Sequence, residues 1–238
     1  MIKNKSTKLT YFWYYFYIKR ILICYWKSVM IVLVGSQKGG CGKSTTAVNI
    51  CAYLSSQEKD VVLVDADRQC TAANWAMDRA ENPELPTVHC VQKYENIRET
   101  LFDLDKRYEY VVVDAAGRDS RELRTGMTAA NILIVPFRPS QPDLDTLPKM
   151  QEVIIQAQDL NPELRVFGLL TMVPSNPMIH EKQEAKECLK DYPEIELLST
   201  VVGDRKAYRD AMSEGVGVVE MNNSKAKAEI QLLAQEIF

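Results

Sequence analysis

Six short runs of apolar residues, rich in Val, Ile and Leu, alternate along the chain with longer helix-like stretches. Within each run the apolar residues are consecutive, a pattern typical of strands that are buried on both faces. Parallel strands need crossover connections, so the pattern predicts a doubly wound α/β fold, with a mostly parallel sheet and helices on both faces. The runs begin at Met30, Val61, Tyr110, Asn131, Arg165 and, more weakly, Ser199.

Helices are expected between these runs. The fifth contains Pro148, so this helix either begins near the proline or kinks there. The sequence has no internal repeat and no linker rich in Gly, Ser or Pro, so residues 30–238 are expected to form one domain. The expected helices are Ser44–Gln57, Thr71–Arg79, Asn96–Leu104, Ser120–Met127, a segment between Asp143 and Leu160, Met178–Leu189, Arg205–Glu214 and Ser224–Glu236.

Residues 1–29 differ from the rest of the chain, because they combine clustered aromatic residues with six Lys/Arg and no Asp or Glu. The segment is too short and too interrupted by charge for a spanning helix. We interpret it as an extension outside the fold, arising either from an upstream start codon before Met30 or as an amphipathic membrane anchor. Residues 30–238 carry 23 Lys/Arg and 32 Asp/Glu, a net charge of −9. Contact with nucleic acid would therefore need a local basic patch.

The loop after the first run, GSQKGGCGKSTT, is rich in glycine. Its last three glycines allow backbone N–H groups to turn inward around phosphate oxygens, while Lys43 supplies positive charge and Ser44 is placed to hold Mg²⁺. Gln37 occupies the position of the first glycine in the strict pattern G-x-x-x-x-G-K-[ST], so the loop is a variant phosphate-binding loop. It also contains Lys38, a second lysine that phosphate binding alone does not require.

With its two lysines, QKGGCGKSTT resembles the deviant Walker A motif of the ParA/MinD ATPases, K-G-G-x-G-K-[ST]-[ST]. The resemblance covers nearly all of residues 30–238. VVLVDADRQ is similar to the family's D-x-D-P-Q segment, YVVVDAAG to its Walker B strand, and VPFRPSQPDLD to its proline-punctuated loop. AANWAMD and RKAYRDAMSEGVGVVE resemble segments of the small plasmid-partition ATPases of the ParF type. The resemblance implies an enzyme that hydrolyses ATP with Mg²⁺, weakly alone and faster with a partner.

In this family the first lysine of the motif reaches across a nucleotide-sandwich dimer to the ATP of the other subunit. By resemblance, Lys38 acts in trans and Lys43 in cis, which couples catalysis to dimerisation. The nucleotide-binding residues that the resemblance implies are Lys38, Gly39, Gly40, Cys41, Gly42, Lys43, Ser44 and Thr45.

Three aspartates follow apolar runs and are expected at the sheet edge where ligands bind. Asp114 is suited to Mg²⁺, directly or through water. The family suggests that Asp67 orients the attacking water as a catalytic residue and that Asp65 supports the water shell of the metal, unless one of them only caps the following helix. Arg68 stands where the family usually has proline. Gly117 is implied as a backbone N–H donor that senses the γ-phosphate.

Several basic residues are candidates for contacts to DNA phosphates. Three arginines at i, i+3 and i+6 are expected on one helix face, and a second group opens the R-x-x-Y helix. The alternative is a solvated helix face with intrahelical partners, for which Glu122 and Asp210 are available. The candidates are Arg118, Arg121, Arg124, Arg205, Lys206 and Arg209.

The resemblance implies a cytoplasmic DNA-partition ATPase that joins the nucleoid when ATP is bound. ATP drives homodimerisation, the dimer binds non-specific DNA, and an adaptor protein at a centromere-like site stimulates hydrolysis, so that a plasmid or mobile element is segregated. The alternative is a MinD-like or cargo-positioning ATPase acting at a membrane or on a protein complex. A membrane role is disfavoured, because the C-terminal stretch carries Glu229 and Glu236 beside its lysines. The sequence also lacks the insertion of a related amide-forming synthetase and the cysteine pattern of an iron–sulfur reductase.

Overall fold

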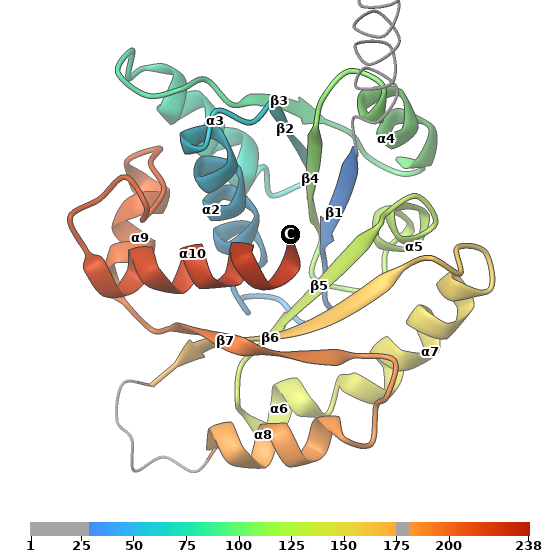
Figure 1. Ribbon diagram of the computed structural model, residues 1–238. Coiled ribbons are helices and arrows are strands. Elements are labelled where there is room, and N and C mark those ends of the chain that lie inside the picture. The colour runs from blue at the N-terminus through green and yellow to red at the C-terminus, as the bar shows by residue number, and fades with distance from the viewer. Residues whose placement is uncertain (1–28, 175–180) are drawn as a thin grey trace, which may run out of the picture.

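The computed structural model describes residues 29–174 and 181–238, so nearly all of the extension at residues 1–29 lies outside the described residues. Seven parallel strands form one sheet in the order β3-β2-β4-β1-β5-β6-β7 (Figure 1). The doubly wound α/β fold is thus confirmed, with a sheet that is parallel throughout the described residues. The strands are β1 (Met30–Val34), β2 (Val61–Ala66), β3 (His89–Gln92), β4 (Tyr110–Ala115), β5 (Ile132–Phe137), β6 (Arg165–Val173) and β7 (Glu196–Gly203).

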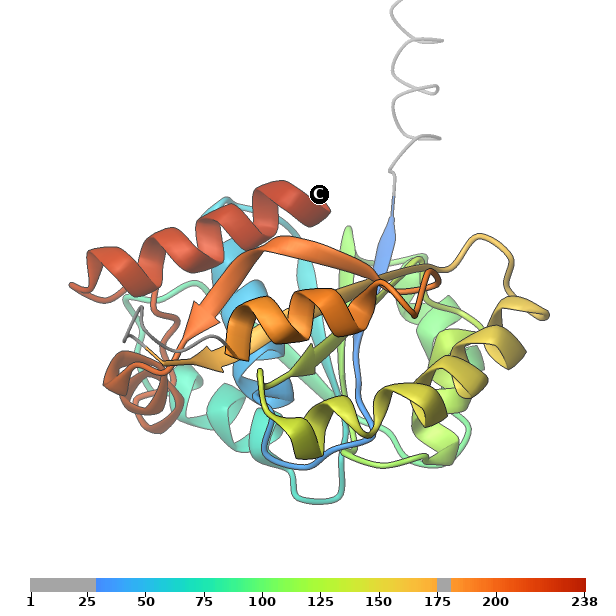
Figure 2. The same cartoon turned by 90° about the horizontal axis from the view of Figure 1, so that it is seen from below.

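Helices cover both faces of this sheet, as the two views in Figures 1 and 2 show. One face carries α2 (Lys43–Ser56), α3 (Thr71–Ala80), α9 (Lys206–Ser213) and α10 (Ser224–Ile237). The other face carries α4 (Arg98–Asp105), α5 (Arg121–Met127), α6 (Gln141–Leu144), α7 (Leu147–Gln158) and α8 (Glu181–Leu189). The first residues of the helix expected from Met178 lie outside the described part of the chain.

The helical segment expected between Asp143 and Leu160 is divided into α6 and α7. Pro148 lies in the first turn of α7, where its missing N–H leaves no intrahelical hydrogen bond unmade. The helix therefore begins near the proline, and the alternative of a kinked helix is wrong.

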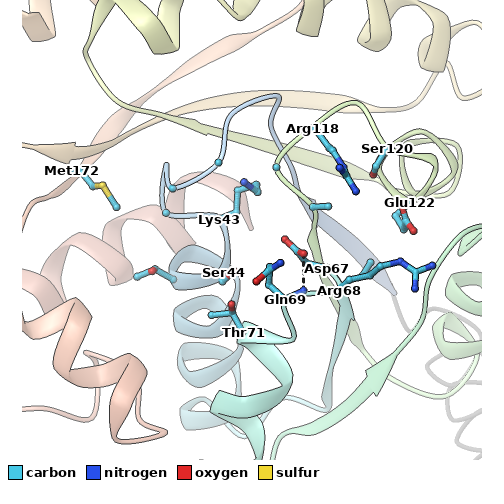
Figure 3. A pocket seen from close by; sticks show the side chains of 17 residues that line it. Lys43, Ser44, Asp67, Arg68, Gln69, Thr71, Arg118, Ser120, Glu122 and Met172 are labelled. Atoms are coloured by element: carbon cyan, nitrogen blue, oxygen red, sulfur yellow. Dashed lines mark hydrogen bonds between the residues drawn. The ribbon is translucent and has the colours of Figure 1, made fainter.

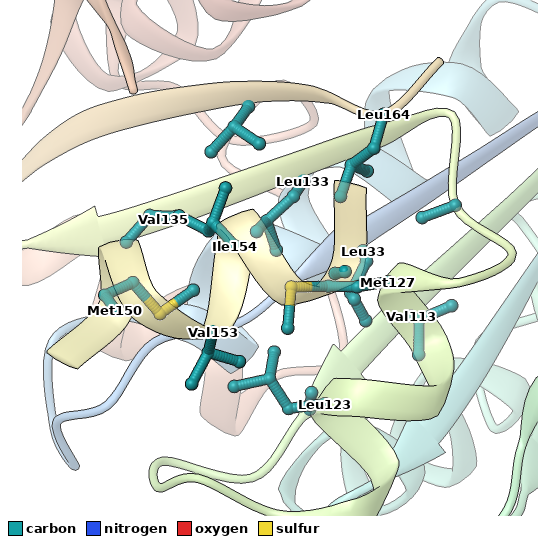
Figure 4. Packing of buried hydrophobic residues seen from close by; sticks show 14 of the residues in the cluster. Leu33, Val113, Leu123, Met127, Leu133, Val135, Met150, Val153, Ile154 and Leu164 are labelled. Atoms are coloured by element: carbon teal, nitrogen blue, oxygen red, sulfur yellow. The ribbon is translucent and has the colours of Figure 1, made fainter. Parts of the chain in front are cut away.

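Both faces of the central strands are buried, because consecutive residues contact different helical layers. In β1, Leu33 belongs to the core beneath α5 and α7, whereas Val34 belongs to the core beneath α2 and α10. Figure 4 shows the first of these cores, in which Ile154 of α7 and Met127 of α5 lie close to Leu33 and Leu133 of the sheet. The consecutive apolar residues are thus used on both faces, and polar side chains collect where the strands end.

Candidate functional site

The carboxyl ends of three neighbouring strands bring the predicted site together. β4 lies between β1 and β2, and its Asp114 pairs in register with Val34 on one side and Asp65 on the other. The glycine-rich loop after β1 therefore lies beside the segments that follow Asp65 and Asp114. A cavity of about 520 Å³ opens between these segments (Figure 3). Its lining residues are Gly39, Gly40, Gly42, Lys43, Ser44, Thr45, Ala66, Asp67, Arg68, Gln69, Thr71, Ala116, Gly117, Arg118, Ser120, Glu122 and Met172.

The backbone of the glycine-rich loop has the shape of an anion-binding loop. Gly40 and Gly42 have φ angles of 71° and 88°, which favour glycine because other residues are strained there. Gly42 is also the N-cap of α2, so the positive end of this helix opens into the cavity. Two loop carbonyls accept hydrogen bonds from outside the loop: Cys41 from Thr171 at 2.7 Å, and Gly40 from Arg138. Because these carbonyls are hydrogen-bonded to side chains outside the loop, the N–H groups of the loop are left to bind an anion.

The two lysines of the loop lie in different environments. Lys43 is 6% exposed, lines the cavity, and donates a hydrogen bond from Nζ to the Lys38 carbonyl at 2.8 Å. The Lys38 ammonium lies outside the cavity lining and donates to the Pro142 carbonyl, at 3.3 Å. Cys41 also lies outside the lining, because its buried thiol packs beside the Ser36 hydroxyl at 3.0 Å. The structure thus brings Lys43 into the cavity and leaves Lys38 at its rim.

Asp114 is a buried carboxylate without a satisfied hydrogen bond. Both of its oxygens are buried without a partner among the described residues, and burial raises its pKa to about 7. Ser44 and the Lys43 charge lower that pKa, although no hydrogen bond of normal geometry joins Asp114 to Ser44. Hard divalent cations prefer oxygen ligands. Unpartnered carboxylate oxygens beside a serine hydroxyl therefore fit Mg²⁺.

The other two aspartates are held by backbone N–H groups. Asp65 accepts from Ala73 at 2.7 Å and from Asp67 at 3.0 Å, so it stabilises the first turn of α3, as the capping alternative supposed. Burial raises the pKa of Asp65, and these hydrogen bonds act in the opposite direction. Asp67 accepts from the Gln69 N–H at 3.0 Å and lines the cavity facing the glycine-rich loop. Of the pair, Asp67 is the one placed to reach a ligand.

Gly117 approaches the glycine-rich loop so closely that it leaves no room for a side chain. A Cβ atom at this position would lie 2.5 Å from Lys43 Nζ and 2.9 Å from the Lys38 carbonyl oxygen. The segment after β4 is thereby packed directly onto the loop that would bind phosphate.

Gly117→Ala is expected to weaken ADP binding by about tenfold or more, because the added methyl group displaces the Lys43 ammonium, and overpacking typically costs about 1–3 kcal/mol. Isothermal titration calorimetry measures the affinity, and thermal unfolding without nucleotide shows whether the fold is retained. Unchanged ADP affinity in a folded variant would show that Lys43 can move aside without loss of binding.

The helix-face prediction for the arginines is wrong in one respect. α5 begins at Arg121 with Ser120 as its N-cap, so Arg118 lies in the preceding loop, where it lines the cavity. The other five candidates form ion pairs, and only Lys206–Asp210 is an intrahelical pair at i, i+4. Glu122 accepts instead from the Glu95 N–H. The remaining pairs are Arg121–Glu95, Arg124–Asp119, Arg205–Glu229 and Arg209–Asp204.

Sequence reasoning missed a second, mainly apolar cavity of about 250 Å³ that adjoins the first. It shares Gly42, Thr45 and Met172 with the first cavity and extends to Tyr208 and Met212 of α9. Met172 has a φ angle of 52°, a left-handed backbone that is uncommon outside glycine. Its other residues come mainly from the ends of β6 and β7 and from α9, and no local motif joins these distant segments. The first cavity thus has charged side chains of both signs in its lining, and it lies beside a mainly apolar cavity.

Comparison with known proteins places the chain in a family. Residues 32–218 match the CobQ/CobB/MinD/ParA nucleotide binding domain. A maintenance of carboxysome distribution protein A from Gloeobacter kilaueensis is 32% identical over 221 residues, covering 87% of this chain and 93% of that protein. Protein ParA from Rhizobium radiobacter is 25% identical over 209 residues, covering 87% and 93% of the two chains.

A solved structure shares the fold. A variant of Cyanothece McdA, solved as an ATP complex, superposes with a TM-score of 0.69 at 14% identity, covering 88% of this chain and 96% of that one. The family match spans most of the chain and includes the glycine-rich loop, Asp65, Asp114 and Gly117. The chain therefore belongs to the CobQ/CobB/MinD/ParA family of nucleotide-binding domains.

Proposed function

We propose that residues 30–238 act as one Mg²⁺-dependent ATPase domain that forms an ATP-bound homodimer, binds DNA without sequence preference, and releases it when an adaptor protein stimulates hydrolysis. Segregation of a plasmid or mobile element is the outcome, in the cytoplasm and on the nucleoid. The observation that carries the proposal is the different placement of the two loop lysines. Lys43 lies inside the cavity and Lys38 at its rim.

Within one subunit, the cavity residues divide the work of binding and hydrolysis. The loop N–H groups, the start of α2 and Lys43 bind the phosphates, and the apolar second cavity receives the nucleoside. Asp114 and Ser44 would hold Mg²⁺, which would neutralise charge on the phosphates. Asp67 orients the attacking water, and the Gly117 N–H lies where it can sense the γ-phosphate. Asp65 keeps α3 and Asp67 in place through its two backbone hydrogen bonds.

Lys38 is free to act on the nucleotide of a second subunit. Among the described residues, the only hydrogen bond of its ammonium goes to the neutral Pro142 carbonyl, at 3.3 Å. A lysine that exchanges one long hydrogen bond for a phosphate gains a charge-assisted contact. Dimerisation then depends on the bound ATP, because the phosphates provide the counter-charge.

DNA contact would use cations that are now in surface ion pairs. Exposed pairs contribute little to stability, so DNA phosphates can replace their carboxylates. The side chains of Arg121, Lys206 and Arg209 are 64%, 79% and 67% exposed, whereas Arg205 is 26% exposed and bound to Glu229. The three exposed residues are therefore the better DNA candidates.

Fluorescence anisotropy of residues 30–238 with random-sequence duplex DNA, over a salt series, tests the proposal. We expect binding with ATP but not with ADP or without nucleotide, weakening steeply with salt. Lys206→Gln combined with Arg209→Gln is expected to weaken binding and reduce its salt dependence, while the control Lys59→Gln, in an exposed loop, leaves both unchanged.

A second candidate function is the positioning of protein cargo. The relative from Gloeobacter is named for carboxysome distribution and is 32% identical over 87% of this chain. Absence of DNA binding at low salt with ATP would contradict the partition proposal and favour this candidate or a membrane-associated one. Among the described residues, none of the helices combines the length and the apolar character needed to cross a membrane.

A further inference from the structure

Arg118 differs from the other arginines of the described chain in having no partner for its side chain. Eleven arginines lie in the described residues, and eight form ion pairs with carboxylates. Arg165 lies over the ring of Phe167, and Arg138 donates to the Gly40 carbonyl. In a domain of net charge −9, an exposed arginine readily finds a carboxylate. Arg118, the exception, lines the cavity beside the glycine-rich loop.

The backbone on both sides of Arg118 is fixed. After it, Asp119 accepts two hydrogen bonds from the Arg124 guanidinium, at 2.6 and 2.8 Å, and the Ser120 hydroxyl caps α5 by accepting from Leu123. Before it, Gly117 packs against the glycine-rich loop, where a Cβ would lie 2.5 Å from Lys43 Nζ. Arg124 is itself held by Gln156 at 2.7 Å. The residues on both sides of Arg118 are thus held by contacts with the rest of the domain.

The side chain of Arg118 lines the cavity that also contains Lys43 and Asp67. Figure 3 shows Arg118 and Lys43 entering this cavity from different segments of the chain. Arg118 directly follows Gly117, and its planar guanidinium can donate two hydrogen bonds to one phosphate. If Lys43 binds the phosphates, this guanidinium lies in the region of the γ-phosphate. A cation that is in place before the reaction needs no reorganisation to stabilise developing charge.

We propose that Arg118 is a catalytic residue that contacts the phosphates of the nucleotide bound in its own subunit, rather than DNA. The inference rests on the proposed ATPase function. In hydrolysis, the water oxygen forms a bond to the γ-phosphorus while the bond from that phosphorus to the β,γ-bridging oxygen breaks. The electron pair leaves with ADP, and the proton of the water passes to inorganic phosphate or solvent. Arg118 stabilises the negative charge that develops on the bridging and γ-phosphate oxygens.

Arg118→Met and Arg118→Lys test this role in single-turnover hydrolysis of labelled ATP, without DNA or adaptor. We expect the rate constant of Arg118→Met to fall by on the order of 10²-fold, while its affinity for ADP changes by less than about threefold. Arg118→Lys retains the positive charge but not the planar, bidentate donors of the guanidinium, so its rate constant is expected to lie between those of Arg118→Met and the wild type. Wild-type protein should bind ADP more tightly with aluminium fluoride, which mimics the transferring phosphoryl group, and Arg118→Met should lose this gain.

The control Arg107→Met removes an exposed arginine that is paired with Asp103 on α4, away from the cavity, and should leave the hydrolysis rate unchanged. Unchanged hydrolysis in Arg118→Met with loss of DNA binding would overturn the inference and return Arg118 to the DNA surface. Unchanged hydrolysis with unchanged DNA binding would overturn it as well. Wild-type protein that hydrolyses ATP but does not bind DNA contradicts only the partition proposal, whereas wild-type protein that does not hydrolyse ATP contradicts both.

Discussion

Lys43→Ala is expected to abolish nucleotide binding, while Lys38→Ala retains ATP binding but does not dimerise. Lys43 is nearly fully buried in the cavity and its ammonium also holds the Lys38 carbonyl, at 2.8 Å. Its removal deletes the phosphate-binding charge and loosens the loop, so the affinity for ADP should fall by at least about 10²-fold. The Lys38 ammonium lies outside the cavity lining and donates to the Pro142 carbonyl. The affinity of the isolated subunit for nucleotide should therefore change little in Lys38→Ala.

Isothermal titration calorimetry measures nucleotide binding, and size-exclusion chromatography with light scattering measures ATP-dependent dimerisation. Lys59→Ala, which removes an exposed loop lysine, is the matched control and should behave as wild type in both. ATP-dependent dimers of Lys38→Ala would contradict the action of Lys38 in trans. Full ADP affinity in Lys43→Ala would show that the loop N–H groups and the start of α2 suffice to bind the phosphates.

The architecture was predictable where one pattern is repeated over many residues. Six strands and the sheet class follow from runs of apolar residues, of which the five inner strands are buried on both faces, and β3 was missed because it lacks that pattern. β3 has four residues, is exposed at both ends and pairs only with β2 at the edge of the sheet. α6 was merged with α7, because a four-residue helix is too short for periodicity to define.

The candidate site was predictable where function depends on local spacing. Asp67 and Gly117 line the cavity with the glycine-rich loop, because each follows the end of a parallel strand. Arg118 was misplaced because its spacing to the next two arginines is that of a helix face, although the expected helix begins only at Ser120; the Ser120 cap fixes that start and leaves Arg118 in the preceding loop. The second cavity depends on contacts between β6, β7 and α9. Such contacts between distant segments leave no local pattern in the sequence.

Asp114→Asn is expected to remove Mg²⁺-dependent hydrolysis and, at the same time, to stabilise the nucleotide-free protein. Burial raises the pKa of Asp114 to about 7, and neither oxygen has a hydrogen-bond partner in the described part of the chain, so the charged form is destabilising without a cation. An asparagine of the same shape carries no charge to bury. We expect the free energy of unfolding at pH 8 to rise by on the order of 1 kcal/mol, and hydrolysis to fall by on the order of 10²-fold.

Asp65→Asn is the matched comparison, because Asp65 lies opposite Asp114 in the register of β2 and β4. Its oxygens accept hydrogen bonds from the N–H groups of Ala73 and Asp67, and an amide at this position would turn a donor toward one of them. Asp65→Asn should therefore destabilise the nucleotide-free protein, opposite in sign to Asp114→Asn. Urea denaturation with and without EDTA measures both changes. If Asp114→Asn were also destabilising, then Asp114 would be satisfied by the protein itself, and the case for a cation at this position would fail.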